Sequence, residues 1–141
     1  MRGLPLWSLL VLGGCPGRGG MGGGGGGECF VDQECISGEI CARDDLCWPE
    51  ADVRFVKVTW TVRGMPASQT SCASHPDLHI RFDGNVSDDL GFAPVPCDIG
   101  MFIVDRLPRP FTRVELSVDN GGPGNVTSIN AAGMATLDLP F

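Results

Sequence analysis

The sequence predicts a mostly β protein, in which a disordered glycine-rich tether and a small disulfide-rich module precede an antiparallel β-sandwich. Two patterns point to this fold class. Cysteines recur at every sixth position over residues 29–47, where apolar residues are few. Residues 53–139 then contain short segments with apolar residues at alternate positions, separated by turn residues, which is typical of a sandwich. No segment has a convincing helical period.

The chain starts with a short apolar run, Leu4 to Leu12, behind the single positive charge of Arg2. A transmembrane helix needs about 20 apolar residues, so the run suits the apolar region of a secretory signal better. Leu12-Gly13-Gly14-Cys15 resembles the lipobox of bacterial lipoprotein signals. The resemblance implies cleavage after residue 14, a diacylglycerol on the Cys15 sulfur, and acylation of the new amino terminus, for example with palmitate. A plain secretory signal, with Cys15 as an incidental thiol, is the alternative.

The number of cysteines agrees with the lipoprotein signal. The chain has seven cysteines, and an odd number in an exported protein requires an explanation. With Cys15 as the lipid carrier, six cysteines remain for three disulfides. Disulfides persist in oxidising compartments outside the cytosol, so export and pairing are consistent with each other.

Residues 15–28 hold the proposed lipid site and a run that is nearly all glycine. Such a chain buries too little surface to offset the entropy lost on ordering, so we expect a flexible tether that averages roughly 20 Å in length. A phosphate-binding loop is the alternative interpretation of a glycine run. It requires a preceding strand, a following helix and a Lys-Ser or Lys-Thr pair, which the sequence lacks.

Residues 29–48 form the predicted disulfide-rich module, with Cys29, Cys35, Cys41 and Cys47 in it. About twenty residues cannot build a sufficient hydrophobic core, so covalent links must replace it. Zinc is the alternative, but zinc ligands usually come in closer pairs, often with histidine. Four cysteines allow three pairings, and the spacing alone does not choose among them.

The pattern of Cys29, Asp32, Cys35, Gly38 and Cys41 resembles the small cysteine-rich repeat of predicted envelope lipoproteins, in which myxobacteria are rich. Related spacing occurs in Dickkopf-type cysteine-rich modules. The resemblance implies a rigid spacer or interaction knob, with Cys29 paired to Cys41 and Cys35 to Cys47.

Residues 49–141 form the predicted sandwich. Trp60 lies on the apolar face of the first strand and is the expected core anchor, worth about 3 to 5 kcal/mol if truncated to alanine. Cys72 and Cys97 are the remaining cysteines, and their disulfide would contribute roughly 3 kcal/mol. The strand segments are expected at residues 53–63, 78–82, 101–104, 114–118, 126–129 and 135–139, with turns at Gly64-Met65-Pro66 and from Asp119-Asn120 to Gly124. Residues 92–97 contain Pro94 and Pro96 and are expected to form an edge strand or an extended loop.

The sequence Val58-Thr59-Trp60-Thr61-Val62, the cysteine pair and Leu107-Pro108 before Phe111 resemble prealbumin-like or immunoglobulin-like sandwich domains of bacterial surface proteins. Many members carry a Leu-Pro-x-Gly-x-Tyr motif there, and Arg109-Pro110-Phe111 departs from it. The resemblance implies the sandwich fold and no particular ligand.

Charge and side-chain chemistry exclude several classes of function. The net charge is −7, with a pI near 4.6, which argues against nucleic-acid binding and against attraction to anionic lipid head groups. His75 and His79 are separated by Pro76 and are expected to face solvent rather than bind a metal. No acid, base and nucleophile converge, so we expect no enzyme, no cofactor and no metal site.

The sequence therefore predicts a non-catalytic protein of the cell envelope, anchored by lipid on Cys15 at the outer membrane or periplasmic face. It would act as a structural or interaction module toward an envelope protein or glycan. The alternative is a secreted or surface sandwich that binds a carbohydrate or another ligand. Exposed aromatic rings would favour that alternative, and the sandwich offers only Phe92, Phe102, Phe111 and Phe141.

Overall fold

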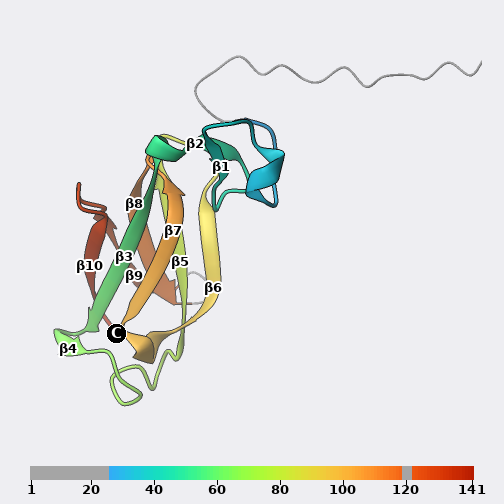
Figure 1. Ribbon diagram of the computed structural model, residues 1–141. Helices are drawn as coiled ribbons and strands as arrows, with labels where there is room; N and C mark the ends of the chain where they lie inside the picture. Colours follow the sequence, from blue (N-terminus) through green and yellow to red (C-terminus); the bar gives the residue numbers. More distant parts are fainter. Residues whose placement is uncertain (1–25, 119–121) are drawn as a thin grey trace, which may run out of the picture.

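The computed structural model describes residues 26–118 and 122–141 (Figure 1). The predicted signal, Cys15, most of the tether and the turn expected at Asp119-Asn120 lie outside these residues. The regular elements of the described part are strands apart from three short 3-10 turns, and it carries three disulfides, which confirms the predicted fold class. None of its helices has the length and apolar character needed to span a membrane.

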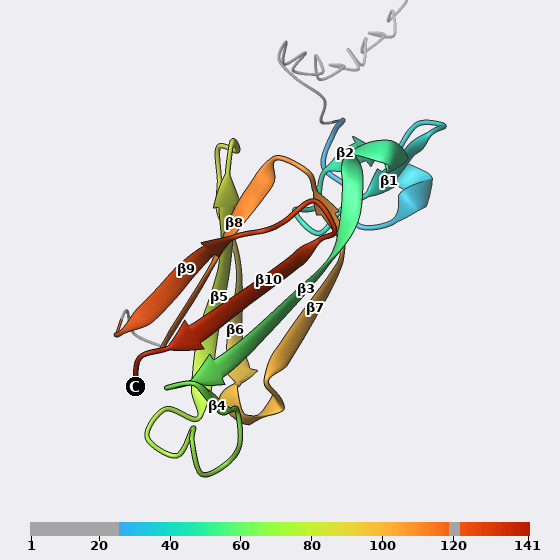
Figure 2. The same ribbon diagram turned by 90° about the vertical axis from the view of Figure 1, so that its left-hand side faces the viewer.

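The disulfide module lies at one end of the sandwich, and the C-terminus lies at the other end (Figures 1 and 2). Its regular elements are two strands and two short 3-10 turns. They are η1 (Asp32–Glu34), β1 (Glu39–Cys41), β2 (Cys47–Pro49) and η2 (Glu50–Asp52). Strands β1 and β2 pair antiparallel, with Ile40 opposite Trp48.

The sandwich consists of two sheets. Strand β3 (Val53–Val62) lies between β7 (Met101–Pro108) and β10 (Met134–Leu139), and β4 (Met65–Pro66) pairs with its end. The second sheet has the order β6 (Leu90–Pro96), β5 (Asp77–Gly84), β8 (Phe111–Val118) and β9 (Gly124–Ser128). Pairing is antiparallel except for β10, which runs parallel to β3.

The core lies between the two sheets, where the alternating apolar positions of the strands meet. Val56, Val58, Trp60 and Val62 of β3 are each at most 3% exposed, as the alternation predicts. They face the equally buried alternate residues of the second sheet, which include Leu78, Ile80 and Phe82 of β5 and Val114 and Leu116 of β8.

The indole N–H of Trp60 is polar, and it has a hydrogen-bond partner within this core. The indole Nε1 donates a hydrogen bond of 2.8 Å to the carbonyl oxygen of Cys97. Cys97 begins the short turn η3 (Cys97–Ile99) and is linked by its disulfide to Cys72 in the loop after β4. The tryptophan and the disulfide thus fix the same corner of the core, at the end away from the module.

A β-bulge interrupts the pairing of β3 with β7. Arg54 lies opposite Leu107 and Val56 opposite Val104, so Phe55 alone faces the two residues Asp105 and Arg106. Arg106 has a φ of 53°, in the left-handed region that side-chain-bearing residues rarely adopt. The bulge presents two adjacent charged side chains where the sandwich meets the module.

Candidate interaction site on the disulfide module

Two disulfides hold the module together. Cys29 is linked to Cys41 and Cys35 to Cys47, with Cα–Cα distances of 5.7 and 5.5 Å. Of the three possible pairings, this is the one that the resemblance to cysteine-rich repeats implies. The sulfurs of Cys29, Cys35 and Cys47 lie within 4.8 Å of one another, so the two disulfides are neighbours. Zinc binds the thiolate form of cysteine, which none of these sulfurs has while bonded to another sulfur.

The module starts three residues earlier than the cysteine pattern suggests. The Gly26 N–H donates to the Cys47 carbonyl at 2.7 Å, the Cys47 N–H donates to the Gly27 carbonyl at 3.2 Å, and Glu28 forms a bridge with Leu46. Gly26 packs so closely that a Cβ there would lie 2.7 Å from the Cβ of Cys47. The sequence predicts residues 26–28 as part of the tether, because backbone pairing of glycine leaves no side-chain signal.

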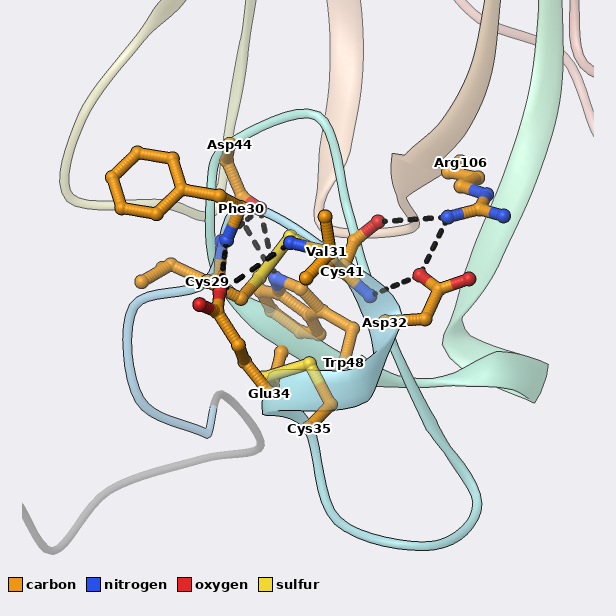
Figure 3. The surroundings of a disulfide bond; sticks show 12 residues. Cys29, Phe30, Val31, Asp32, Glu34, Cys35, Cys41, Asp44, Trp48 and Arg106 are labelled. Carbon is orange, nitrogen blue, oxygen red and sulfur yellow. Dashed lines mark hydrogen bonds and ion pairs between the residues drawn. A yellow bond between two sulfur atoms is a disulfide. The ribbon is translucent and has the colours of Figure 1, made fainter.

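Asp32 connects the module internally and to the sandwich. Its Oδ1 accepts hydrogen bonds from the Cys41 N–H at 3.1 Å and from Nη1 of Arg106 at 2.6 Å (Figure 3). The same Arg106 Nη1 donates to the Cys41 carbonyl at 3.4 Å. The Cys41 N–H, followed by Arg106, holds the pKa of Asp32 below its ordinary value, because both interactions favour the charged carboxylate.

Further contacts fix the module on the sandwich. Arg43 of the module pairs with Asp105 of the bulge at 2.6 Å, and the Arg43 N–H donates to the Arg106 carbonyl at 3.3 Å. Arg109 holds η2 at the connection itself: it donates from its N–H to the Asp52 carbonyl at 2.8 Å and from Nε to the Ala51 carbonyl at 3.0 Å. The two residues of the bulge and Arg109 therefore form a junction that resists rotation of the module.

Trp48 closes the module against a half-buried carboxylate. Its indole Nε1 lies 3.0 and 3.2 Å from the two carboxylate oxygens of Asp44 (Figure 3). Burial raises the pKa of Asp44, and the hydrogen bond from Trp48 opposes that rise. The sequence marked Trp48 only as the end of the module, since nothing in the spacing predicted this contact.

The surface of the module has an apolar tip. The ring of Phe30 points away from the module (Figure 3) and is 84% exposed. Val31 and Ile36 are also exposed. The backbone under the tip is held by Glu34, whose Oε2 accepts from the Phe30 N–H at 2.6 Å and from the Val31 N–H at 3.4 Å. A large apolar side chain is thus presented to solvent on a backbone that the Cys29–Cys41 disulfide fixes.

The module also concentrates the negative charge of the chain. Residues 26–52 contain eight acidic residues and one basic residue, Arg43, and so carry a net charge of −7, equal to that of the whole chain. The eight are Glu28, Asp32, Glu34, Glu39, Asp44, Asp45, Glu50 and Asp52. The total charge alone does not reveal this asymmetry, although it is visible in the order of residues.

A cleft of about 490 Å³ lies between the module and the edge of the sandwich. Phe30 and Val31 line it from the module, and Phe92 lines it from β6. Phe92 is held from behind by Phe102, with ring centroids 5.1 Å apart. The ion-paired Asp32 and Arg106 also line the cleft, together with Gln33, Cys41, Ala42, Arg43 and Asp45.

The two histidines considered as metal ligands, His75 and His79, do not line this cleft. The ring of His75 packs edge-on against Phe141, with centroids 4.6 Å apart, so it is partly covered rather than fully facing solvent. His79 lies on the outer face of β5, beside Gly91. A shallow depression of about 410 Å³ on the same sheet is lined by charged and small residues. Its lining includes no aromatic ring of the kind on which sugars commonly stack. Its lining residues are Arg81, Asp83, Arg113, Glu115, Gly124, Asn125 and Val126.

Comparison with known proteins adds no relative: no family model, curated protein or solved structure matches the chain.

Proposed function

We propose that this protein is a lipid-anchored component of the cell envelope, which presents the disulfide module as an interaction site and has no catalytic activity. The use of the cysteines carries the proposal. Three disulfides take up the six cysteines of residues 26–141, and Cys15, the seventh, stands in the lipobox-like sequence. Disulfides persist outside the cytosol, where such a lipid anchor would place the folded part.

The position of the module supports the interaction role. The described residues begin at Gly26, in the module, so along the sequence the module is the described part nearest to a lipid on Cys15. Its exposed apolar residues Phe30, Val31 and Ile36 could be covered by a partner, and its high negative charge would select a cationic one, which supports a recognition surface over a spacer. The sandwich then serves as the rigid support to which the module is fixed.

The intact mass of the protein extracted from bacterial membranes tests the proposal, with thiols alkylated before and after reduction. We expect a chain that starts at Cys15 and carries diacylglycerol and acyl groups, with six alkylated thiols that appear only after reduction. A Cys15→Ser variant should lose the lipid and keep all three disulfides. A wild-type chain without lipid contradicts the anchor, and thiols that react before reduction contradict the disulfides and favour the zinc alternative.

A further inference from the structure

The cleft between the module and β6 has the chemistry of a docking site. It combines two aromatic rings, Phe30 and Phe92, with the carboxylate of Asp45. We infer that it binds an exposed segment of a partner protein that carries an apolar side chain next to lysine or arginine. The inference names the kind of partner for the interaction site and so rests on the proposed function.

The aromatic rings supply the apolar part of the site. Phe30 is 84% exposed. A partner that covers its ring removes apolar surface from water, which makes a favourable contribution to the binding free energy. Phe92 forms the other wall and is kept in place by edge-on contact with Phe82 and by its contact with Phe102. An apolar side chain of suitable size would therefore meet one ring on each side.

Both walls are already ordered in the free protein. The backbone of Phe30 is fixed by the disulfide of Cys29 and by the hydrogen bond to Glu34, and the module is fixed on the sandwich through Arg43 and Arg106. Ordering of flexible groups is one of the main costs of association, so a preformed cleft retains more of the binding free energy.

The charges decide which partner fits. Arg43 and Arg106 are neutralised by Asp105 and Asp32, whereas Asp45 makes no ion pair within residues 26–118 and 122–141. The cleft therefore offers an uncompensated carboxylate, on a module whose net charge is −7. Such a surface attracts a cationic segment and repels an anionic bilayer.

Fluorescence anisotropy with three labelled synthetic peptides of equal length tests the inference. The first peptide alternates lysine and leucine, the second lysine and serine, and the third glutamate and leucine. The full-length protein is used as isolated, in phosphatidylcholine nanodiscs if it carries lipid and in buffer if it does not, with empty nanodiscs subtracted. A chain without lipid can therefore still bind the peptide, and a chain that carries lipid can fail to bind it, so failure of this inference and failure of the proposed function are distinguishable.

We expect the lysine–leucine peptide to bind about tenfold more tightly than either of the other two, since only it satisfies both parts of the cleft. Phe30→Ser should weaken this binding about tenfold, as loss of an exposed aromatic anchor does. Asp45→Asn should weaken it several-fold, and added salt should remove that difference. Asparagine suits the positive φ of 60° at position 45, so this variant keeps the backbone.

Met65→Ser is the matched control. Met65 is also an exposed apolar residue, 60% accessible, but it lies on β4 outside the cleft, and its loss should leave peptide binding unchanged. Equal binding of the three peptides, or equal effects of Phe30→Ser and Met65→Ser, would overturn the inference. So would Phe30-dependent flotation with phosphatidylcholine vesicles, which indicates a bilayer contact, or Phe30-dependent dimerisation, which indicates a second copy as the occupant.

Discussion

Two carboxylates of the module lie in opposite electrostatic surroundings. Asp32 accepts hydrogen bonds from the Cys41 N–H and from Arg106, and both lower its pKa. Asp44 is partly buried, and burial raises its pKa in spite of the hydrogen bond from Trp48. The charged form of Asp32 is therefore favoured by folding, whereas the charged form of Asp44 is disfavoured.

These shifts predict opposite effects of pH on stability. Asp32 contributes stability above its ordinary pKa and loses it as the pH falls through the lowered value. Asp44 contributes below its ordinary pKa and loses its contribution as the pH rises through the raised value. Asp32→Asn should therefore destabilise the module at neutral pH, whereas Asp44→Asn should not.

Denaturant unfolding from pH 7 down to about pH 2, followed by Trp48 fluorescence, measures both effects. Trp60→Phe in the background removes the signal of the sandwich tryptophan. The same neutral-pH loss in both variants would show that the two carboxylates do not differ in this way.

Arg106 forms the ion pair with Asp32 across the junction and adopts an unfavourable backbone conformation. Its φ of 53° is tolerated by glycine without cost, while a residue with a Cβ pays about 1 kcal/mol. We expect Arg106→Ala to be less stable to thermal unfolding than Arg106→Gly, because alanine keeps the unfavourable φ and both lose the ion pair with Asp32. Equal melting temperatures would mean that the bulge relaxes when the arginine is removed.

At the scale of the elements, the sandwich depends on β3 and on the corner where it meets η3. The indole of Trp60 on β3 donates to the Cys97 carbonyl, and Cys97 is tied to Cys72. All three residues are at most 3% exposed. The disulfide joins two residues 25 positions apart, and the loop between them holds all of β5 and β6, so it restricts the unfolded chain as well as the folded corner.

Replacing both Cys72 and Cys97 by alanine should lower the free energy of unfolding of the sandwich by about 3 kcal/mol. Thermal or urea unfolding followed by Trp60 fluorescence measures the loss. The matching Cys35→Ala/Cys47→Ala variant should leave the sandwich transition in place, since that pair belongs to the module. A sandwich transition that moves equally in both variants would contradict this division.

The strands could be predicted because alternation is a local property. The positions of Val56, Val58, Trp60 and Val62 all follow from the period of two, and the structure buries all four. The parallel pairing of β10 with β3 and the bulge at Asp105 could not be predicted, because both depend on which strands become neighbours. The segment read as a turn at Met65-Pro66 pairs back on β3, since Gly64 at a φ of 73° makes the turn tight.

The candidate site was predictable only as a location. The cysteine spacing marked the module, and the resemblance gave the pairing, but the cleft needs Phe92 of β6 and Arg106 of β7 beside a module more than forty residues earlier in the chain. Such a contact arises from tertiary folding and leaves no trace in spacing. The exposure of Phe30 was equally hidden, because a lone phenylalanine between cysteines reads as a core residue.

At the scale of the whole molecule, the module and the sandwich are joined by exposed ion pairs and backbone hydrogen bonds rather than by a shared core. The apolar clusters of the two parts are separate, and the module cluster contains only its cysteines. Arg43 and Asp105 are each more than half exposed, and exposed pairs of this kind contribute about 0.2 to 1 kcal/mol each. The junction is therefore ordered, yet weak enough to loosen.

Loosening the junction should expose the connection at Glu50, which lies in η2 between the two parts. In an Arg43→Ser/Arg106→Gly variant, we expect a glutamate-specific protease to cleave after Glu50 several-fold faster than in the wild type, as resolved by mass spectrometry of the fragments. Arg113→Ser is the control, since it removes an exposed ion pair with Asp83 that lies within the sandwich. Unchanged cleavage in the double variant would mean that Arg109 alone fixes the connection.

The central position of β3 has a mechanical consequence. A pull applied at Gly26 passes through the module, whose two disulfides bear it covalently, and reaches the sandwich at Val53. Force then runs along a ten-residue strand that is bonded on both sides, to β7 and to β10. Its hydrogen bonds are loaded together in shear instead of being opened one at a time, so the fold is arranged to bear tension from its N-terminal end.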